Sequence, residues 1–261
     1  MDIPDKLKDF RNFLYVVWKH LNLPNPTPIQ YEIAAYMQGG DRRAIIEGFR
    51  GVGKSWICSA YIVHQLLLDP SKNILVVSAS KTRADDFSTF TLRLIHELPI
   101  LAHLRPTASQ RFSKISFDVG PAPASHAPSV KSLGVTSQLT GSRADIIVAD
   151  DIEVVGNSAT QGMRDKLGEQ VKEFDAIIKP EAESRILFLG TPQCEDTVYN
   201  KLTERGYKKR IWPAKYVTQK TNESSYDGTV SDYCVKDECE GESTEPLRFS
   251  DIDLAEREAS Y

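Results

Sequence analysis

The chain has 261 residues, of which 41% are hydrophobic and 26% are charged, and its formal net charge is -4. This composition is typical of a globular protein with one large domain or two small ones, and it excludes a disordered or fibrous chain. No apolar run is long enough to cross a bilayer, and the first ten residues lack the basic and apolar segments of a signal peptide. We therefore expect a soluble intracellular protein with no membrane partner.

The acidic residues are concentrated near the C-terminus. Residues 221–261 contain twelve Asp and Glu against three Lys and Arg, which leaves 24 acids and 29 bases in residues 1–220. The first 220 residues therefore carry a net charge of +5. A mildly basic body suits a polyanionic partner but does not require one.

The first elements expected along the chain are two helices, a strand and a third helix. Residues 5–20 carry apolar side chains at helical spacing, and three prolines then separate them from a second helical pattern at 29–37. The run RAIIEG, residues 43–48, reads as a short buried strand that leads into a glycine-rich loop. Residues 55–69 then read as a helix that is apolar on most faces.

Strands and helices continue to alternate after residue 70. Apolar runs predict strands at residues 73–80, 144–151, 185–192 and 208–213, and helical spacing predicts helices over about residues 83–97 and 160–178. Residues 105–145 are rich in Pro, Ser and Ala and are the least regular part. Buried strands that alternate with helices predict an α/β fold whose mainly parallel sheet is flanked by helices.

Apolar periodicity fades after about residue 217. Residues 218–261 have the composition of an acidic linker or a small surface subdomain, and the run DIDLAEREASY at the end resembles the start of a helix. The sequence therefore predicts one α/β domain over residues 1–217, followed by this acidic segment.

The glycine-rich run GFRGVGKS, residues 48–55, matches the phosphate-binding pattern G-x-x-x-x-G-K-[S/T], the Walker A motif. Its place between a strand and a helix is the context that such a loop needs, although the pattern also arises by chance. Glycines let backbone N–H groups converge on phosphate oxygens, and the helix adds the positive end of its dipole. We expect Lys54 to contact the β- and γ-phosphates and Ser55 to offer a hydroxyl to Mg²⁺. The loop residues predicted to bind nucleotide are Gly48, Phe49, Arg50, Gly51, Val52, Gly53, Lys54 and Ser55.

A second motif, ADIIVADDIE, is an apolar run that ends in acids, as a Walker B strand does. Asp150 is the expected partner of Mg²⁺ near Ser55, and Asp151 is positioned to orient the attacking water. Glu153 is the alternative for that second role. Solvated acids at the end of a strand are the simpler interpretation, but the phosphate loop upstream favours roles in metal binding and hydrolysis.

The acid pair and the missing guanine-reading motif favour ATP as the nucleotide. NKLT at 200–203 lacks the acid that would accept a hydrogen bond from guanine, and small-molecule kinases usually lack a water-orienting acid. The amide of Gln30 offers both a donor and an acceptor, so it can pair with N6 and N7 of adenine. A surface glutamine is the alternative interpretation. If Gln30 binds adenine, residues 1–40 form a helical segment on the adenine side of the site.

Two arginines are candidates for stabilising charge on the γ-phosphate during hydrolysis. Arg50 lies within the glycine-rich loop, and Arg143 precedes the acidic strand on a loop that could reach a neighbouring subunit. Either could instead form a structural ion pair.

Two further loops follow predicted strands. LFLGTPQ ends in Gly190 and Thr191, and the threonine could hydrogen-bond the hydrolytic water or the γ-phosphate and couple nucleotide state to a neighbouring segment. An ordinary turn at Gly and Pro is the alternative. In SASKTRADDF, Lys81 and Arg83 could contact a DNA backbone or the cleft, because loops at the carboxyl ends of parallel strands carry the functional groups. A solvated loop explains these two bases equally well.

Together, Gln30, GFRGVGKS, LVVSASKTRADDF, LTGSRADIIVADDIE and LFLGTPQ resemble, in order and spacing, the ATPase domain of a large terminase subunit. This family is the DNA-packaging motor of tailed bacteriophages, and the resemblance is to the short-tailed phages over about residues 10–215. It implies an ASCE-type P-loop ATPase that uses ATP and Mg²⁺. Its phosphate-loop lysine and metal-binding hydroxyl correspond to Lys54 and Ser55, and its acid pair to Asp150 and Asp151.

The resemblance also implies a coupling motif at Gly190–Pro192 and an arginine acting across subunits at Arg143. Many members have Glu where this chain has Asp151, which leaves the water-orienting role shared with Glu153. The family assembles as a ring on the portal protein of an empty procapsid, in the cytoplasm of the host, and packages double-stranded DNA with a small terminase subunit. Its C-terminal nuclease domain has no counterpart here, so we expect no metal-dependent DNA cleavage.

Two other functions remain open at this point. The first lobe of a helicase-like translocase would look similar, but its second lobe and the Q-x-x-G-R arginine motif have no counterpart in this sequence. A nucleotide-binding assembly module that does not hydrolyse its ligand is the other alternative, and the acid pair argues against it.

Overall fold

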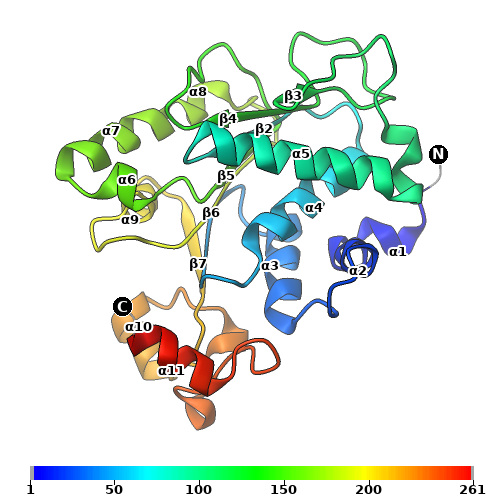
Figure 1. Cartoon of the computed structure of the whole chain (residues 1–261). Helices are drawn as coiled ribbons and strands as arrows, with labels where there is room; N and C mark the ends of the chain where they lie inside the picture. Colours follow the sequence, from blue (N-terminus) through cyan, green and yellow to red (C-terminus); the bar gives the residue numbers. More distant parts are fainter. Residues whose placement is uncertain (1–2, 260–261) are drawn as a thin grey trace.

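The computed structural model describes residues 3–259 and contains a seven-stranded sheet flanked by helices on both faces (Figure 1). In sheet order the strands are β3 (Ser116–Phe117), β4 (Val130–Gly134), β2 (Ile74–Ser78), β5 (Ile146–Asp150), β6 (Arg185–Gly190), β1 (Arg43–Gly48) and β7 (Lys208–Trp212). All neighbouring strands are parallel except β3, which pairs antiparallel with β4. The predicted α/β class and mainly parallel sheet are confirmed.

Strand β4 lies inside the stretch that has no clear pattern in the sequence. Its residues alternate between buried and partly exposed positions, and Lys131 interrupts the apolar run that marks the other inner strands. It pairs with β2 in a parallel register. With the short strand β3 beyond it, the sheet therefore extends two strands further than apolar runs alone predict.

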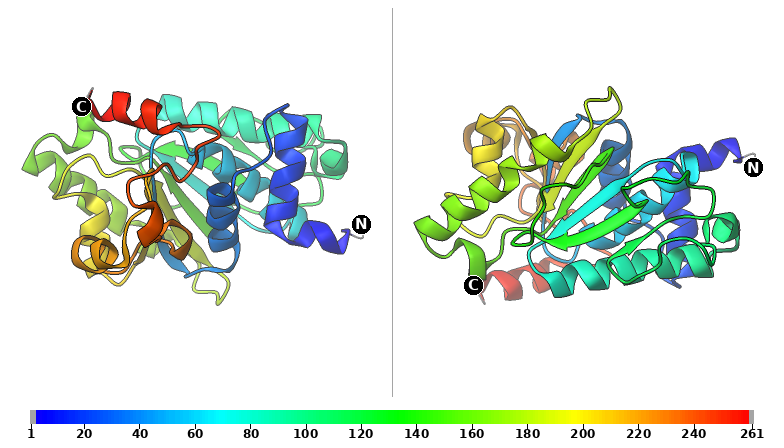
Figure 2. Two further views of the ribbon diagram at one scale, coloured as in Figure 1. Left: turned by 90° about the horizontal axis from the view of Figure 1, so that it is seen from below. Right: turned by 90° about the horizontal axis from the view of Figure 1, so that it is seen from above.

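Two groups of helices cover the two faces of the sheet (Figure 2). On one face lie α2 (Phe10–His20), α3 (Pro28–Gly39), α4 (Lys54–Leu68), α5 (Lys81–Glu97) and the 3-10 helix η1 (Pro99–Leu104). On the other face lie α7 (Gln161–Lys172), α8 (Phe174–Ile177) and α9 (Val198–Glu204). Along β1, Ala44 and Ile46 face the first group and Ile45 faces the second, so both faces of the strand are buried. This is the burial that continuous apolar strands predict.

Short polar side chains fix where several helices begin. The expected single helix over residues 5–20 is instead divided into α1 (Asp5–Lys8) and α2, because Asp9 is extended and its carboxylate accepts the backbone N–H of Arg11. Thr27 caps α3, and its capping box includes the side chain of Gln30 at the third helical position. Capping of this kind satisfies N–H groups that the helix itself leaves unpaired.

The acidic segment is an ordered subdomain packed against the edge of the sheet beyond β7, and not an extended linker (Figure 1, orange to red). It contains α10 (Gln219–Tyr226), the 3-10 helices η2 (Asp232–Cys234) and η3 (Asp237–Cys239), and α11 (Asp251–Ala259). Val230 pairs with Ile211 of β7, and Val230 and Cys234 join the main hydrophobic core. A few buried apolar residues therefore anchor the segment, too widely spaced to produce a periodic pattern.

Within residues 3–259, no helix has both the length and the apolar character that crossing a membrane requires.

Candidate nucleotide-binding site

The site is built at the carboxyl edge of the sheet, where β1 ends at Gly48 and α4 begins at Lys54. The intervening loop needs glycine at two points, since Gly51 and Gly53 have φ angles of +94° and +92°. Gly53 is also the N-cap of α4, so the loop wraps around the positive end of this helix. The predicted strand, loop and helix thus form in the expected order.

Lys54 is 6% exposed and connects two neighbouring strands. Its Nζ atom donates hydrogen bonds to the carbonyl oxygen of Gly48 at 2.7 Å and to Oγ1 of Thr191 at 3.0 Å. Burial lowers the pKa of Lys54, and the nearby acids Asp151 and Asp150 oppose that change. A buried ammonium group that lines a pocket is suited to binding an anion in place of these neutral partners.

Asp150 ends β5 directly beside the start of α4. Its carboxylate lies near Ser55, which lines the same pocket, and its Oδ1 atom is buried without a hydrogen-bond partner. Burial, followed by the charge of Asp151, raises the pKa of Asp150 to about 6 against opposing effects of Ser55, Lys54 and Arg83.

An unpartnered carboxylate oxygen next to a serine hydroxyl fits Mg²⁺, which is usually held by one or two protein oxygens together with phosphate and water. Among residues 3–259, no group of three or more His, Cys, Asp or Glu side chains is arranged to hold a metal by itself. The residues present therefore fit a metal held jointly with a phosphate ligand.

The two acids after Asp150 lie in different environments. Asp151 is partly exposed, lines the same pocket as Lys54 and adopts a positive φ of 45°. Glu153 is buried, and its carboxylate accepts hydrogen bonds from the backbone N–H of Gln193, from Thr197 Oγ1 and from the N–H of Val198. Glu153 therefore holds the connection between β6 and α9 together, whereas Asp151 is open to the pocket.

Strand β6 lies between β1 and β5, so the predicted coupling motif ends between the loop and the acids. Thr191 donates to the carbonyl of Gly48 at 2.9 Å and accepts from Lys54. Gly190 packs against α9 so closely that a Cβ atom would lie 1.8 Å from the hydroxyl of Tyr199. The structure brings these residues to the loop, as their position in the sequence predicts.

Gln30 lies on the other side of the loop and is buried. Its Nε2 atom donates to the carbonyl of Val52 at 2.8 Å, and its Oε1 atom accepts from the backbone N–H of Thr27 at 3.0 Å. Each end of the amide keeps a second hydrogen-bonding position, so pairing with a base remains chemically possible. Phe49, the remaining loop residue, packs partly against the core.

The two candidate arginines lie in different places. Arg50 lines the pocket and donates to Oε1 of Gln193 at 3.4 Å. Arg143 lies before the amino end of β5, at the opposite end of that strand from Asp150, and donates to the carbonyl of Ala176 at 2.7 Å. The structure therefore does not bring Arg143 to the loop of its own chain, and its action on a neighbouring subunit stays a prediction.

The two bases after β2 also differ. Arg83 lines an adjoining pocket with Ser55, Asp150 and Asp151, which supports the prediction that it faces the cleft. Lys81 begins α5 and is exposed.

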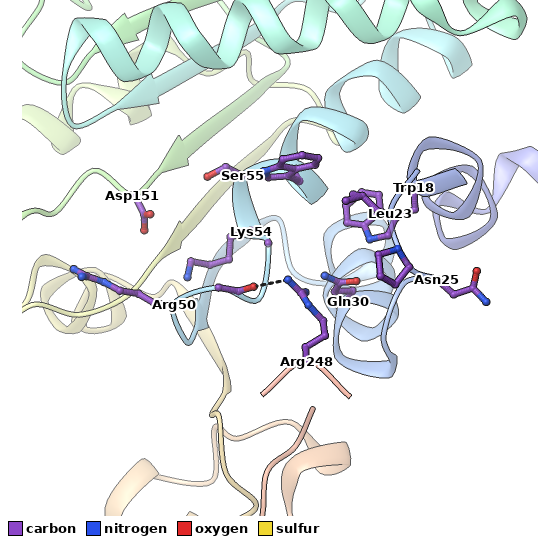
Figure 3. A pocket seen from close by; sticks show the side chains of 13 residues that line it. Trp18, Leu23, Asn25, Gln30, Arg50, Lys54, Ser55, Asp151 and Arg248 are labelled. Atoms are coloured by element: carbon purple, nitrogen blue, oxygen red, sulfur yellow. Dashed lines mark hydrogen bonds between the residues drawn. The ribbon is translucent and has the colours of Figure 1, made fainter. Parts of the chain in front are cut away.

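The pocket also contains residues that sequence reasoning missed (Figure 3). They are Trp18, Leu23, Pro24, Asn25, Trp56 and Arg248. The run LPNP that follows the first helix could have marked part of this wall, because it must turn the chain back before α3. Nothing in the sequence connects Arg248 with a loop almost 200 positions earlier.

The loop, the lysine and the acidic strand, with one strand between them, define a P-loop NTPase of the ASCE type. Comparison with known proteins agrees with this class. The chain is 50% identical over 262 aligned residues to the terminase large subunit of Enterobacteria phage T3. This alignment covers 97% of the chain but 44% of the relative, so the chain spans less than half of that protein's length. At this identity the chain is a homologue of phage large terminase subunits, and the resemblance drawn from its motifs is confirmed.

Solved structures share the fold at low identity. The large terminase of bacteriophage HK97 superposes with a TM-score of 0.53 at 12% identity, covering 81% of this chain and 44% of that chain. The DEAD-box helicase Mss116 gives a TM-score of 0.53 at 14% identity, covering 81% of this chain and 42% of that chain. No family model matches the chain.

Proposed function

We propose that this chain hydrolyses ATP, with Mg²⁺, to drive double-stranded DNA into a viral procapsid. The observation that carries the proposal is the meeting of Lys54, Ser55, Asp150 and Asp151 at one edge of the sheet. The 50% identity to a protein named as a terminase large subunit supports DNA packaging as the use of that hydrolysis.

The side chains support a division of work in hydrolysis. Lys54 would exchange its bond to Gly48 for the β- and γ-phosphates and balance their charge. Ser55 and Asp150 would hold Mg²⁺, which neutralises charge on the phosphate oxygens when bound. Asp151, open to the pocket, would accept a hydrogen bond from the attacking water and orient it.

Coupling to a neighbouring segment would pass through Thr191. When Lys54 turns to phosphate, Thr191 loses a donor, so its oxygen can accept a hydrogen bond from the water. Its hydroxyl would donate to the γ-phosphate by giving up its bond to the Gly48 carbonyl. Glu153 also connects the loop after β6 to the start of α9, because it accepts hydrogen bonds from the N–H groups of Gln193 and Val198. A shift of Thr191 would therefore be transmitted to that helix.

The proposed partners follow from the terminase relationship. They are double-stranded DNA, the portal protein of the procapsid, a small terminase subunit and further copies of this chain in a ring. The proposed location is the host cytoplasm and, transiently, the portal vertex. The net positive charge of residues 1–220 is compatible with a DNA partner.

The test is steady-state ATP hydrolysis by the wild-type chain, by Lys54→Ala and by a control, Lys220→Ala, which removes an exposed lysine from α10. Each is measured alone, with duplex DNA and with single-stranded nucleic acid. We expect Lys54→Ala to abolish turnover and the control to retain it. Unchanged turnover in Lys54→Ala contradicts the proposal.

A helicase-like translocase is the second candidate, because Mss116 shares the fold. Stimulation of ATP hydrolysis by single strands but not by duplex DNA would favour it over packaging. Binding of ATP without turnover under any of these conditions would favour the assembly module.

The role of Arg143 is tested by mixing inactive variants. If Arg143 acts on the ATP of a neighbour, Arg143→Ala subunits mixed with Lys54→Ala subunits should recover part of the activity. At some interfaces the Arg143→Ala subunit supplies an intact Lys54, and its Lys54→Ala neighbour supplies an intact Arg143. Absence of recovery leaves Arg50 as the arginine of the site.

A further inference from the structure

The pocket has two chemically different halves (Figure 3). One half contains the charged groups Lys54 and Asp151, on which the proposed hydrolysis depends. The other half is walled by apolar and uncharged polar residues of α2, α3 and the turn between them, and the charged side chain of Arg248 extends into it. Those wall residues are Trp18, Leu23, Pro24, Asn25 and Gln30.

Arg248 reaches the pocket from the C-terminal subdomain, which folds over the outer side of the glycine-rich loop. Its Nη2 atom donates to the carbonyl oxygen of Gly51 at 3.0 Å. The next residue, Phe249, lies against the Cα of Gly51, where a Cβ atom would come within 2.6 Å of the ring. Phe249 also packs edge-to-face on Phe49 with ring centroids 5.5 Å apart. The subdomain is therefore fitted to the loop at three points.

A buried carboxylate links this segment to the wall of the pocket. The side chain of Glu245 is 0% exposed and lies 3.8 Å from a guanidinium nitrogen of Arg248. It also accepts a hydrogen bond from the hydroxyl of Thr27, the residue that caps α3 and accepts the backbone N–H of Gln30. One acid thus holds both Arg248 and the helix that carries Gln30.

We propose that Arg248 is a nucleotide-binding residue whose guanidinium stacks on the purine base of ATP, opposite the wall formed by Leu23 and Pro24. This inference rests on the proposed function and adds the side chain that closes its base subsite. A guanidinium is planar and weakly hydrated, so it can stack on an aromatic base while its edge still donates to the Gly51 carbonyl.

The surroundings of Arg248 favour the base over the phosphates as its partner. Its edge is turned to a carbonyl oxygen, and Gln30 stands beside it, whereas Lys54 and Arg50 lie toward the acids (Figure 3). Two cations are therefore already placed at the phosphate half, while Arg248 is turned to the Gly51 carbonyl on the side of Gln30.

The experiment measures binding of ATP, ADP and inorganic tripolyphosphate to the wild-type chain, Arg248→Ala and Arg248→Lys by calorimetry or competition. Arg257→Ala is the matched control. Like Arg248, Arg257 lies over the Phe249 ring, with its Cζ atom 4.7 Å from the ring centroid, but it does not line the pocket. Thermal unfolding checks that each variant is folded. Lys54→Ala, measured in parallel, reports on the phosphate half.

We expect Arg248→Ala to weaken ATP and ADP equally, by about 3- to 30-fold, the range of a cation–π contact at increasing burial, and to leave tripolyphosphate unchanged. Arg248→Lys should recover little, because an ammonium group cannot stack as a plane. Arg257→Ala should bind all three ligands as the wild type does.

Equal weakening of ATP and tripolyphosphate by Arg248→Ala would place Arg248 on the phosphates and overturn base stacking. Unchanged ATP binding in that variant would remove Arg248 from the site while leaving the proposed function intact. If the wild-type chain bound neither ATP nor tripolyphosphate, the proposed function itself would fail, and this inference with it.

Discussion

Asp150→Asn should raise the free energy of unfolding while it abolishes hydrolysis. The reason is that burial and the charge of Asp151 disfavour the ionised carboxylate of Asp150 in the folded state. Its folded pKa of about 6 exceeds the ordinary value of 3.8. At about 1.4 kcal/mol per pH unit, the ionised carboxylate lowers the stability of the folded state by about 3 kcal/mol above pH 6. The amide removes this penalty but places an N–H group where Oδ1 has no partner, which offsets about 1–2 kcal/mol.

The net expected gain is about 1–2 kcal/mol, or a rise of about 2–4 °C in Tm for a chain of this size. The assay is thermal unfolding of both proteins at pH 7.5 in metal-free buffer. Adding Mg²⁺ with nucleotide should stabilise the wild type alone and narrow the difference.

The pH dependence of the stability difference between the two proteins tests the direction of this effect. A carboxyl group whose folded pKa is raised binds its proton more tightly in the folded state. The penalty is therefore absent below pH 3.8, grows between pH 3.8 and 6, and is complete above pH 6. The advantage of Asp150→Asn should shrink as the pH falls from 7.5 to 5. An equal or lower Tm for the variant at pH 7.5, or turnover close to that of the wild type, would refute the reasoning.

Three further predictions concern the same site. Gly190→Ala should destabilise the fold by about 1–3 kcal/mol in thermal unfolding, because its Cβ would overlap the hydroxyl of the α9 tyrosine; Gly156→Ala, which meets nothing within 4 Å, is the neutral control. Gln30→Ala should reduce the preference for ATP over GTP about tenfold in competition binding, as expected for one lost hydrogen bond, and an unaltered preference would argue against an adenine role. Glu153→Gln should lower the free energy of unfolding by about 1–3 kcal/mol, because its amide turns an N–H donor toward backbone N–H groups. Asp151→Asn should abolish turnover with little change in Tm. Loss of turnover in Glu153→Gln but not in Asp151→Asn would make Glu153 the water-orienting acid.

Much of the site was predictable because its loop and strands are contiguous runs whose backbone conformation or burial restricts the residue types. The glycines at 51 and 53 adopt left-handed backbone angles that other residues rarely reach, so a pattern of glycines marks such a loop. Apolar runs predicted β1, β2, β5 and β6 because these strands are buried on both faces. Strand β4 was not predicted, because its alternating, partly polar residues are equally compatible with an irregular segment.

The role of individual polar residues depended on their partners. The sequence favours Asp151 over Glu153 for orienting the water but leaves both open, and in the fold three hydrogen bonds engage Glu153 while Asp151 faces the pocket. Arg143 is three positions before the first residue of β5, and the length of that strand separates it from Asp150. Because Arg143 precedes this strand and Asp150 ends it, the chain order already places the two residues at opposite ends, and the structure adds that Arg143 donates to the carbonyl of Ala176.

The sequence by itself determined the phosphate loop, the acidic strand, the parallel sheet and the relationship to large terminase subunits. These features are written in contiguous runs whose backbone geometry or burial constrains residue type. Only the tertiary structure decided that the acidic segment packs on the loop and that Arg248 enters the pocket beside Gln30. Such contacts join residues far apart in the chain, and they depend on a few buried groups, such as Glu245 and Phe249, that leave no periodic signal.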